Sequence, residues 1–416
     1  MIIERGIPMQ TDFLRLDPQK RGLAKKIYNA LNEYEKEYVS RSDNSDEPIE
    51  GSEREKITRL LEELSEVSLE QQIEISALSD GEWLCTSYRI LSETAEPFVP
   101  KNQFDNEFFM LIDILRKTSS EGLFEALKQS MFDLKKRYES NYTVFVEYFA
   151  KFPLWGTLDP KRQDFDTLKR RAAVLKHHTY DFVWLFRRLS DYLSKRTLFA
   201  ILLNWAVIDM TMLGKVKSIF PDYFEPDIFP DNKDDIFVDV GAYIGDTVYN
   251  YVSNYGYDYK KICAYEISPK SCEQMRKNLA GLEKLHDLEI HCKGAGSAAG
   301  EFFLSESEFD QSANQLSQAG KSSGQRVEVA ALDDEFPDGF TFLKMDIEGA
   351  EYEALKGSRR NICTHHPKLA ICTYHGYDDI WRIPALIDRY NPDYKFYMRY
   401  NGGNLIPTEF VLLAKD

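Results

Sequence analysis

Apolar residues in the first half of the chain recur three and four positions apart, the spacing of one face of an α-helix. Ile57, Leu60, Leu61 and Leu64 show this pattern clearly. Each such stripe has to pack against another apolar surface, so we expect a mainly α-helical N-terminal region. The expected helices are Gly22–Val39, Arg54–Leu78, Phe104–Lys117, Leu123–Tyr138, Asp166–Lys176 and Tyr180–Leu213.

Two segments stand apart from this pattern. Ser40–Gly51 is polar, acidic and nearly free of large apolar residues, which predicts a flexible connection. Leu198–Leu213 is strongly apolar but contains Asn204 and Asp209 and falls short of the about 20 apolar residues that a bilayer requires. We therefore expect a buried helix there and no membrane span.

The pattern changes after Phe220, where Pro221, Pro226 and Pro230 exclude a continuous helix. Beyond them, short apolar runs alternate with amphipathic segments, which is typical of βαβ units in a parallel sheet. We expect three parts: a helical region over residues 1–179, a helical lead-in and proline-rich boundary over 180–235, and an α/β domain over 236–416.

The α/β region is expected to consist of the following elements. The strands are Ile236–Val240, Lys261–Glu266, Leu288–Cys292, Phe340–Asp346, Leu369–Tyr374, Lys395–Arg399 and Glu409–Ala414, with extra short strands at Glu301–Leu304 and Arg326–Ala330. The helices are Gly245–Asn254, Pro269–Ala280, Ala350–Arg359 and Trp381–Tyr390.

Composition narrows the class of partner. Hydrophobic residues make up 43% of the 416 residues, as in ordinary globular proteins. The formal net charge of -16 argues against nucleic acid as a partner, because phosphate binding requires clustered Lys and Arg. The basic runs Lys135–Arg137 and Lys169–Arg171 are interpreted as solvated helix faces. A small-molecule or glycan substrate is the better expectation.

The six cysteines form no C-x-x-C pair, so we expect free buried thiols, neither a zinc site nor a disulfide framework, and a reducing compartment. Charged residues interrupt the first 17 positions, where a signal peptide has an unbroken apolar stretch. The expected location is cytoplasmic.

The segment IFVDVGAYIGDTV carries the first candidate chemistry. A buried strand ends at Asp239 and Val240, Gly241 permits a tight turn, and Gly245 lets a helix begin close to a ligand. The glycine spacing departs from G-x-G-x-x-G, and there is no Walker lysine. The turn indicates nucleotide handling, although a purely structural turn has the same pattern.

The next strand ends in AYEISP, which places Glu266 at the carboxyl edge of the sheet. An acid at this position accepts both ribose hydroxyls of a nucleotide. A solvated strand-end glutamate is the alternative. Because no pyrophosphate-binding pattern is present, an adenosine without phosphates, as in S-adenosylmethionine, fits best.

In FTFLKMDIEGAEYEALKG, Lys344 and Asp346 share one face of a strand, since strand side chains alternate. A lysine in a central strand is costly to bury unpaired, so we expect Lys344 to meet a carboxylate. Gly349 opens a helix that ends at Gly357. Glu348 and Glu351 can simply favour a helix N-terminus, and for Glu351 we prefer this interpretation to a catalytic role.

The strand LAICTYH delivers His375 to the same edge of the sheet. A histidine there can remove a proton from a hydroxyl near neutral pH, although it can also simply bond a loop. We expect Asp346 or His375 to accept the proton and Lys344 to orient the carboxylate. A divalent metal such as Mg²⁺ at Asp346 is an alternative that we do not expect, because no second acid pair stands out.

Together these segments resemble the FkbM family of methyltransferases. The resemblance rests on FVDVGAYIGDTV, YEISP, FLKMDIEGAEYEALKG, PKLAICTYHGYDDIWRIPALI, KFYMRYN and TEFVLLAK, with YDFVWLFRRLSDYLSKRTLFAILLNW as a helical lead-in. It implies a class I, Rossmann-like methyltransferase sheet of seven mostly parallel strands with the last strand antiparallel. It also implies O-methylation of a sugar, glycan or small secondary-metabolite hydroxyl.

The resemblance implies site residues as well. S-adenosylmethionine, which leaves as S-adenosylhomocysteine, is expected to be held through its methionine end, its ribose and its adenine. The residues expected at the methionine end are Asp239, Gly241, Ala242, Tyr243, Gly245 and Asp246. Glu266 is expected to hold the ribose, and Ile267 and Ser268 to lie beside the adenine, with Gly294 and Ala295 as weaker candidates. Tyr243 departs from the family pattern, where a smaller polar residue such as Asn is common.

A rival interpretation makes the chain a cofactor-binding scaffold, with an inactive methyltransferase domain and helices that recruit a partner or a second copy. The glycine turn, Glu266 and Asp346 together favour an enzyme.

Overall fold

The computed structural model describes residues 13, 15–42, 51–65, 80–282, 284–305, 315–318 and 325–416. The chain divides into two compact units. One unit comprises Met1–Glu139, Phe165–Arg187 and Trp205–Ile208, and the other comprises Ser140–Asp164, Arg188–Asn204 and Asp209–Asp416. Each unit is made of several separate segments of the chain. The sequence had predicted successive parts instead, with boundaries at residues 179 and 235.

The first unit is helical, as expected. Its helices are α1 (Pro18–Ser42), α2 (Gly51–Ser65), α3 (Asp80–Ala95), α4 (Gln103–Lys117), α5 (Ser120–Arg137), α7 (Asp166–His177) and most of α8 (Thr179–Arg188). Apolar faces of α1, α2 and α3 share one core, in which Leu31, Leu61 and Leu84 are fully buried. Helix α3 was not predicted, and the expected extension of the second helix beyond Ser65 lies outside the described residues.

The expected single helix Tyr180–Leu213 is wrong, because the structure contains two helices, α8 and α9 (Tyr192–Val207). Between them, Leu189 forms a β-bridge with Phe396, and the Ser190 backbone N–H donates to the Phe396 carbonyl at 2.8 Å. This tertiary contact takes up backbone groups that a continuous helix would use. No described helix is long and apolar enough to cross a membrane.

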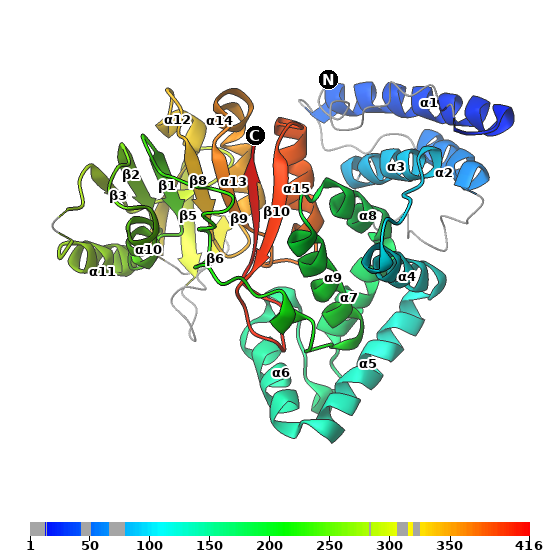
Figure 1. Ribbon diagram of the computed structural model, residues 1–416, viewed down its shortest axis with the longest axis horizontal. Helices are drawn as coiled ribbons and strands as arrows, with labels where there is room; N and C mark the ends of the chain where they lie inside the picture. Colours follow the sequence, from blue (N-terminus) through cyan, green and yellow to red (C-terminus); the bar gives the residue numbers. More distant parts are fainter. Residues whose placement is uncertain are drawn as a thin grey trace. The chain divides into compact units, whose positions relative to one another are not determined.

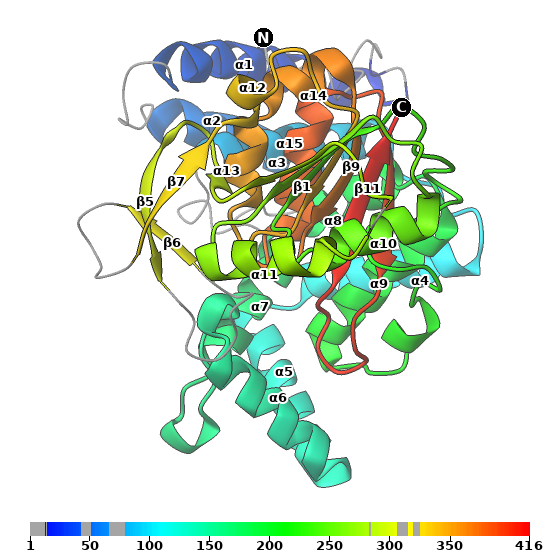
Figure 2. The same cartoon turned by 90° about the vertical axis from the view of Figure 1, so that its left-hand side faces the viewer.

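The second unit contains a seven-stranded sheet in the order β10-β11-β9-β8-β1-β2-β3 (Figures 1 and 2). The strands are β1 (Ile236–Val240), β2 (Lys261–Tyr265), β3 (Leu288–His291), β8 (Phe342–Met345), β9 (Lys368–Cys372), β10 (Lys395–Tyr400) and β11 (Phe410–Lys415). Strand β11 runs antiparallel to both neighbours, and the other described pairs are parallel. The expected fold class is confirmed, and strand ends differ from prediction by at most two residues.

Helices cover both faces of this sheet. Figure 2 shows α10 (Asp246–Tyr255) and α11 (Pro269–Leu279) in front of it, with α13 (Glu351–Lys356), α14 (Arg359–His365) and α15 (Asp379–Tyr390) behind. The expected helix Ala350–Arg359 corresponds to α13, which ends earlier, at Lys356, and α14 was not predicted. A Cβ at Gly357 would lie 2.0 Å from the carbonyl oxygen of Gly296, so the helix ends where two backbones touch.

The remaining elements are short. A second sheet has the order β4-β7-β5-β6, formed by β4 (Gly294–Ala295), β5 (Gly300–Ser305), β6 (Gln315–Gln318) and β7 (Gln325–Ala330). The other elements are α6 (Glu139–Lys151), η2 (Pro153–Trp155), η3 (Pro160–Arg162), η4 (Leu213–Lys215) and α12 (Leu332–Glu335). Strands β5 and β7 were predicted, whereas β4, β6 and α6 were not.

The expectation that all cysteines are free is wrong for one pair. Cys272, on α11, and Cys292, just after β3, form a disulfide. Helix α11 packs against β3, which brings together two residues 20 positions apart. Cys85, Cys263, Cys363 and Cys372 are free thiols.

Strand register places three candidate residues side by side. Val240 is aligned with Tyr265 on one side and with Met345 on the other. The following residues, Gly241, Glu266 and Asp346, therefore leave the sheet together at its carboxyl edge, where ligands of open α/β sheets bind.

Gly241 brings the ends of β1 and β8 together. Its φ of +81° lies in the left-handed region, and a Cβ there would lie 1.8 Å from the carbonyl oxygen of Asp346. No other residue type fits this approach without displacing the β8 backbone.

We predict that Gly241→Ala lowers the free energy of unfolding by more than about 3 kcal/mol, since it adds a backbone clash to the roughly 1–3 kcal/mol of the left-handed conformation. Gly256→Ala is the matched control, because Gly256 has a φ of +80° and nothing within 4 Å of an added Cβ. Urea unfolding measures both. Equal losses would show that the backbone contact is unimportant.

Candidate functional site

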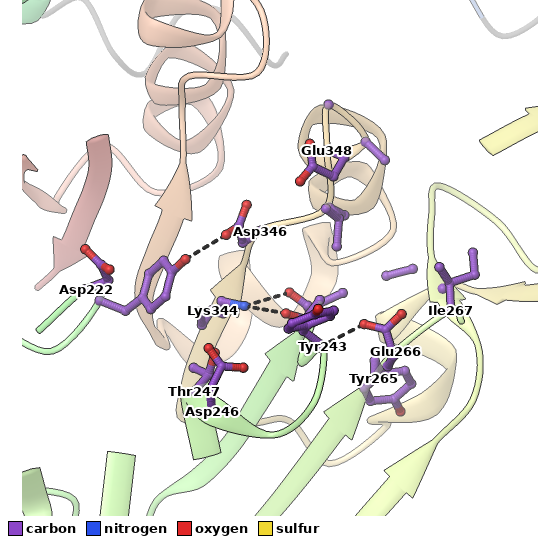
Figure 3. Close-up of a pocket in the computed structure, with 18 of the residues that line it drawn as sticks. Asp222, Tyr243, Asp246, Thr247, Tyr265, Glu266, Ile267, Lys344, Asp346 and Glu348 are labelled. Carbon is purple, nitrogen blue, oxygen red and sulfur yellow. Dashed lines mark hydrogen bonds between the residues drawn. The ribbon is translucent and has the colours of Figure 1, made fainter. Parts of the chain in front are cut away.

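A pocket of about 550 Å³ opens at the carboxyl edge of the sheet (Figure 3). Its volume is in the usual range for small-molecule sites. The lining residues all belong to the second unit: Leu154, Asp222, Tyr223, Val240, Gly241, Tyr243, Asp246, Thr247, Asn250, Tyr265, Glu266, Ile267, Lys293, Gly294, Ala295, Lys344, Asp346, Ile347, Glu348, Gly349, Ala350, Tyr374 and Glu409.

The structure brings nine of the expected site residues into this lining: Gly241, Tyr243, Asp246, Glu266, Ile267, Gly294, Ala295, Lys344 and Asp346. Figure 3 shows Glu266 and Ile267 on one side of the pocket and Asp222 and Asp346 on the other. A ligand that contacts both groups has to extend along the edge of the sheet.

The other five expected residues lie behind the lining, and the structure gives most of them packing or capping roles. Ala242 is fully buried. A Cβ at Gly245 would meet Met275 and Leu279, so the absence of a side chain here lets α11 pack closely against the turn. Ser268 caps α11 by accepting the Ser271 backbone N–H at 3.3 Å. Asp239 and His375 are buried beneath the pocket floor and are described below.

Glu266 is fixed by backbone groups. Its two carboxylate oxygens accept the N–H of Tyr243 at 2.9 Å and the N–H of Ser268 at 2.8 Å. Burial raises the pKa of Glu266, and these two donors act in the opposite direction. The carboxylate therefore couples the turn after β1 to the turn after β2 and keeps lone pairs that can accept hydroxyl groups.

Several lining residues were missed from the sequence. Asp222 and Tyr223 belong to the proline-rich segment that was interpreted only as a boundary, and Leu154 comes from far upstream. Glu409 directly precedes β11. Since β11 is antiparallel, its first residue lies at the carboxyl edge of the parallel strands, and this was the one signal in the sequence that pointed to Glu409.

Lys344 meets a carboxylate, as expected. Its Nζ lies 3.1 Å from Asp239 Oδ1 and donates to the Gly241 carbonyl at 2.7 Å. Both side chains are almost completely buried, at 2% and 0% exposed. Burial alone would lower the pKa of Lys344, but Asp239 and Asp346 raise it overall, so the lysine stays charged.

Asp346 is surrounded by donors. The Tyr223 hydroxyl donates to Oδ2 at 2.7 Å, and the Tyr374 hydroxyl lies 3.4 Å from Oδ1. His375 Nε2 lies 3.3 Å from the same Oδ1. Burial would raise the pKa of Asp346, but the positive charges of His375 and Lys344 hold it below its usual value.

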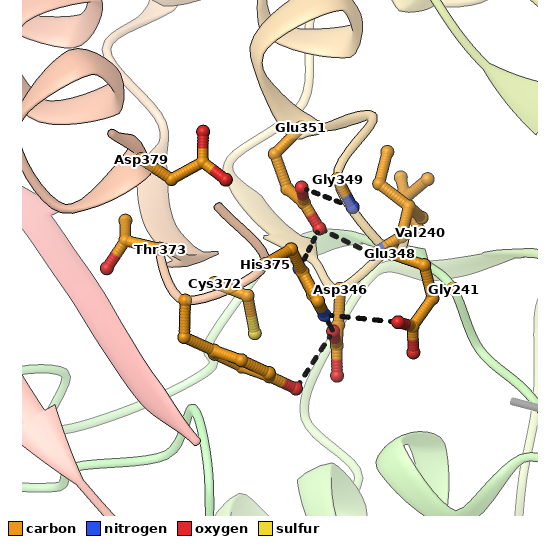
Figure 4. Close-up of polar contacts among 12 residues, drawn as sticks. Val240, Gly241, Asp346, Glu348, Gly349, Glu351, Cys372, Thr373, His375 and Asp379 are labelled. Carbon is orange, nitrogen blue, oxygen red and sulfur yellow. Dashed lines mark hydrogen bonds and ion pairs between the residues drawn. The ribbon is translucent and has the colours of Figure 1, made fainter. Parts of the chain in front are cut away.

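His375 is enclosed by three carboxylates (Figure 4). Its Nδ1 lies 2.9 Å from Glu351, and its Nε2 lies 3.3 Å from Asp346 and 3.5 Å from Glu348. Burial would lower the pKa of His375, but these acids raise it to about 10. An imidazole with this pKa already holds its proton at neutral pH, so the environment does not suit His375 as a proton acceptor.

Glu351 anchors this arrangement. Its carboxylate accepts the backbone N–H of Ile347 at 2.7 Å and of Gly349 at 3.0 Å, in addition to facing His375. The interpretation of Glu351 as an acid that favours a helix N-terminus agrees with its place in the first turn of α13. It also fixes the loop that carries Glu348.

A family model and several solved structures match the α/β region of the chain. Residues 239–400 match the family model described as methyltransferase FkbM domain. The chain is similar to a methyltransferase FkbM from Methylobacillus flagellatus KT, with 26% identity over 58% of this chain and 60% of that one, and a TM-score of 0.49. The match thus spans less than two thirds of the length of that protein.

Two further solved structures are more distant. An rRNA methylase from Streptococcus thermophilus has 13% identity over 47% of this chain and 99% of that one, with a TM-score of 0.29. Fibrillarin from Aeropyrum pernix, solved with natively bound S-adenosyl-L-methionine, has 10% identity over 44% and 67%, with a TM-score of 0.27. No curated protein matches the sequence.

We predict that Lys344→Met lowers the free energy of unfolding by about 3–5 kcal/mol, because it leaves Asp239 charged, buried and unpaired. Adding Asp239→Asn should restore most of this loss. Lys356→Met, which removes an exposed pair with Glu353 on α13, is the control and should change stability by under about 1 kcal/mol. Additive losses in the double variant, measured by urea unfolding, would contradict the pairing.

The charge of His375 predicts a pH dependence of stability. Its pKa in the folded protein, about 10, lies above the unfolded value of 6.5, so its contribution is complete below pH 6.5 and is lost as the pH rises to about 10. Unfolding of the wild type and of His375→Gln, measured from pH 6 to 10, should show a difference that shrinks with pH. His365→Gln, at an exposed histidine, is the control; a pH-independent difference for His375→Gln would refute the assignment.

Proposed function

We propose that the chain, which carries a methyltransferase FkbM domain over residues 239–400, is an S-adenosylmethionine-dependent methyltransferase. The observation that carries the proposal is the single pocket lined by the glycine turn after β1, by Glu266 after β2 and by Asp346 after β8. These residues follow the carboxyl ends of β2, β1 and β8, which are neighbouring parallel strands of the sheet, and a hydrogen bond joins Glu266 to the turn after β1.

We assign the two ends of the pocket as follows. Glu266 binds the ribose hydroxyls, since its carboxylate is already oriented by two backbone donors. Ile267, Gly294 and Ala295 offer the adenine an apolar surface, and a Cβ at Gly294 would lie 2.8 Å from Ile267. Gly241, Tyr243 and Asp246 hold the methionine end, supported from behind by Asp239, Ala242 and Gly245, whereas Ser268 lies at the adenine end, where it supports Glu266. S-adenosylmethionine supplies the methyl group.

The acceptor is proposed to be a hydroxyl of a sugar, glycan or small metabolite. The side of the pocket away from Glu266 carries the carboxylates of Asp222 and Glu409 together with the tyrosines Tyr223 and Tyr374. Carboxylates accept hydrogen bonds from hydroxyl groups, and tyrosine rings pack against the faces of a polyol. The net charge of -16 speaks against a nucleic acid.

Calorimetric titration with S-adenosylmethionine and S-adenosylhomocysteine tests the cofactor assignment. Glu266→Gln should weaken both ligands by about 10- to 100-fold, because hydrogen bonds to a charged acceptor contribute about 1.5–3 kcal/mol. Glu273→Gln, at an exposed acid on α11 paired with Lys277, should bind as the wild type does. Absence of binding by the wild type would refute the proposed function.

Radiolabelled methyl transfer identifies the acceptor class. Tritiated S-adenosylmethionine is incubated with the protein and a pool of methyl glycosides, or with a pool of phenolic metabolites. Label in the glycoside pool supports a sugar hydroxyl, and label only in the phenolic pool supports the small-metabolite alternative.

A further inference from the structure

We propose that Glu348 removes the proton from the acceptor hydroxyl, while Glu409, just before β11, positions that hydroxyl and Asp346, which is near both, acts as a fixed charge. This assignment rests on the proposed function and replaces the two residues that the sequence suggested, Asp346 and His375. Three independent features of the pocket support it.

The first feature is that Asp346 and His375 already have polar partners within the protein. Asp346 has the Tyr223 hydroxyl on one oxygen and His375 next to the other. These partners stabilise its ionised form, so a proton is held there only weakly. His375 carries its own proton and is 1% exposed, with Glu351 closing its far side. Neither group is set up to accept a proton from a molecule in the pocket.

The second feature is backbone strain. Among the described residues other than glycine, ten have a positive φ, and four of these ten line this one pocket: Tyr223 (71°), Tyr243 (45°), Glu348 (56°) and Glu409 (56°). Left-handed conformations are unfavourable for these residue types, and strained residues of this kind cluster at active sites and ligand-binding segments. Both glutamates are therefore held in the pocket against their backbone preference, from two separate segments.

The third feature is the electrostatic setting of Glu348. Its side chain is 24% exposed, and its carboxylate lies 3.5 Å from His375 Nε2. Desolvation raises its pKa to about 7, together with the negative charges of Asp346, Glu351 and Glu409, and against the positive charge of His375. A base with this pKa is well matched to proton transfer near neutral pH.

Glu409 has a different set of contacts. Its pKa is also raised to about 7, first by burial and then by Asp346 and Asp222. However, its carboxylate accepts a hydrogen bond from the Tyr374 hydroxyl at 3.1 Å, which fixes its orientation. Glu409 therefore suits the binding of an acceptor, and its charge keeps the proton affinity of Glu348 high.

In the proposed step, proton transfer to Glu348 accompanies methyl transfer to the acceptor oxygen. The acceptor hydroxyl gives its proton to a Glu348 oxygen while its own oxygen bonds to the methyl carbon. The carbon–sulfur bond breaks with its electron pair remaining on sulfur, which removes the positive charge of the donor. Glu348 afterwards releases the proton to water through the open side of the pocket. No metal, oxidant or further reactant is needed.

Proton release on ligand binding tests this assignment without a known acceptor. S-adenosylmethionine carries a positive sulfonium that S-adenosylhomocysteine lacks, so only the former lowers the pKa of a carboxylate at the reacting position. Near pH 7 the wild type should release up to about half a proton more with S-adenosylmethionine than with S-adenosylhomocysteine. Calorimetry in buffers of different ionisation enthalpy measures this difference.

Three variants give the expected pattern. In Glu348→Gln the difference in proton release should fall to near zero while both ligands still bind within about threefold of the wild type. In Glu409→Gln the difference should persist but reach its maximum at a lower pH, because the like charge is gone. Glu353→Gln, at an exposed acid on α13 outside the pocket, should match the wild type.

A difference that is unchanged in Glu348→Gln, or is lost only in Glu409→Gln, overturns the assignment while leaving the proposed function intact. Failure of the wild type to bind either ligand overturns both. With an acceptor in hand, Glu348→Gln should lower kcat by about 100- to 10,000-fold. Glu348→Gly should be as inactive yet melt at or above the wild-type temperature, because glycine relieves the left-handed backbone; a lower melting temperature with retained turnover would indicate a purely structural role.

Discussion

The backbone at Gly241 and the carbonyl of Asp346 lie so close that no side chain fits between them, and the geometry of the pocket depends on this approach. It brings the ends of β1 and β8 together at the carboxyl edge of the sheet. The Glu266 carboxylate extends the same arrangement to β2 by accepting the N–H of Tyr243. The positions of these three strand ends therefore follow from backbone contacts, and the pocket side chains are carried on that frame.

Buried charge decides which groups in the pocket can change protonation. Lys344 is neutralised by Asp239 beneath the pocket, and His375 is enclosed by Glu351, Asp346 and Glu348. Both positive charges stay fixed near neutral pH, and both favour the ionised form of Asp346. The positive charges lower the pKa of Asp346, whereas at Glu348 and Glu409 burial and the neighbouring carboxylates outweigh His375 and raise the pKa of both to about 7.

The side of the pocket away from Glu266, proposed to bind the acceptor, is formed by parts of the chain outside the βαβ repeats. Asp222 and Tyr223 come from the proline-rich segment before β1, and Glu409 comes from the turn before the antiparallel strand. The side next to Glu266, proposed to hold the cofactor, consists by contrast of turns that follow successive strands of the sheet.

The sequence by itself determined the order of strands and helices, the glycine turn, the acids after β2 and β8, and the need of Lys344 for a carboxylate. These follow from local rules: period-two and period-3.6 patterns, turn chemistry and the cost of an unpaired buried charge. The tertiary structure decided the break between α8 and α9, the Cys272–Cys292 disulfide, the entry of Tyr223 and Glu409 into the pocket and the three carboxylates that raise the pKa of His375. Each of these depends on contacts between residues distant in the chain, and the charge state of a buried group is set by all its neighbours together, which no local pattern specifies.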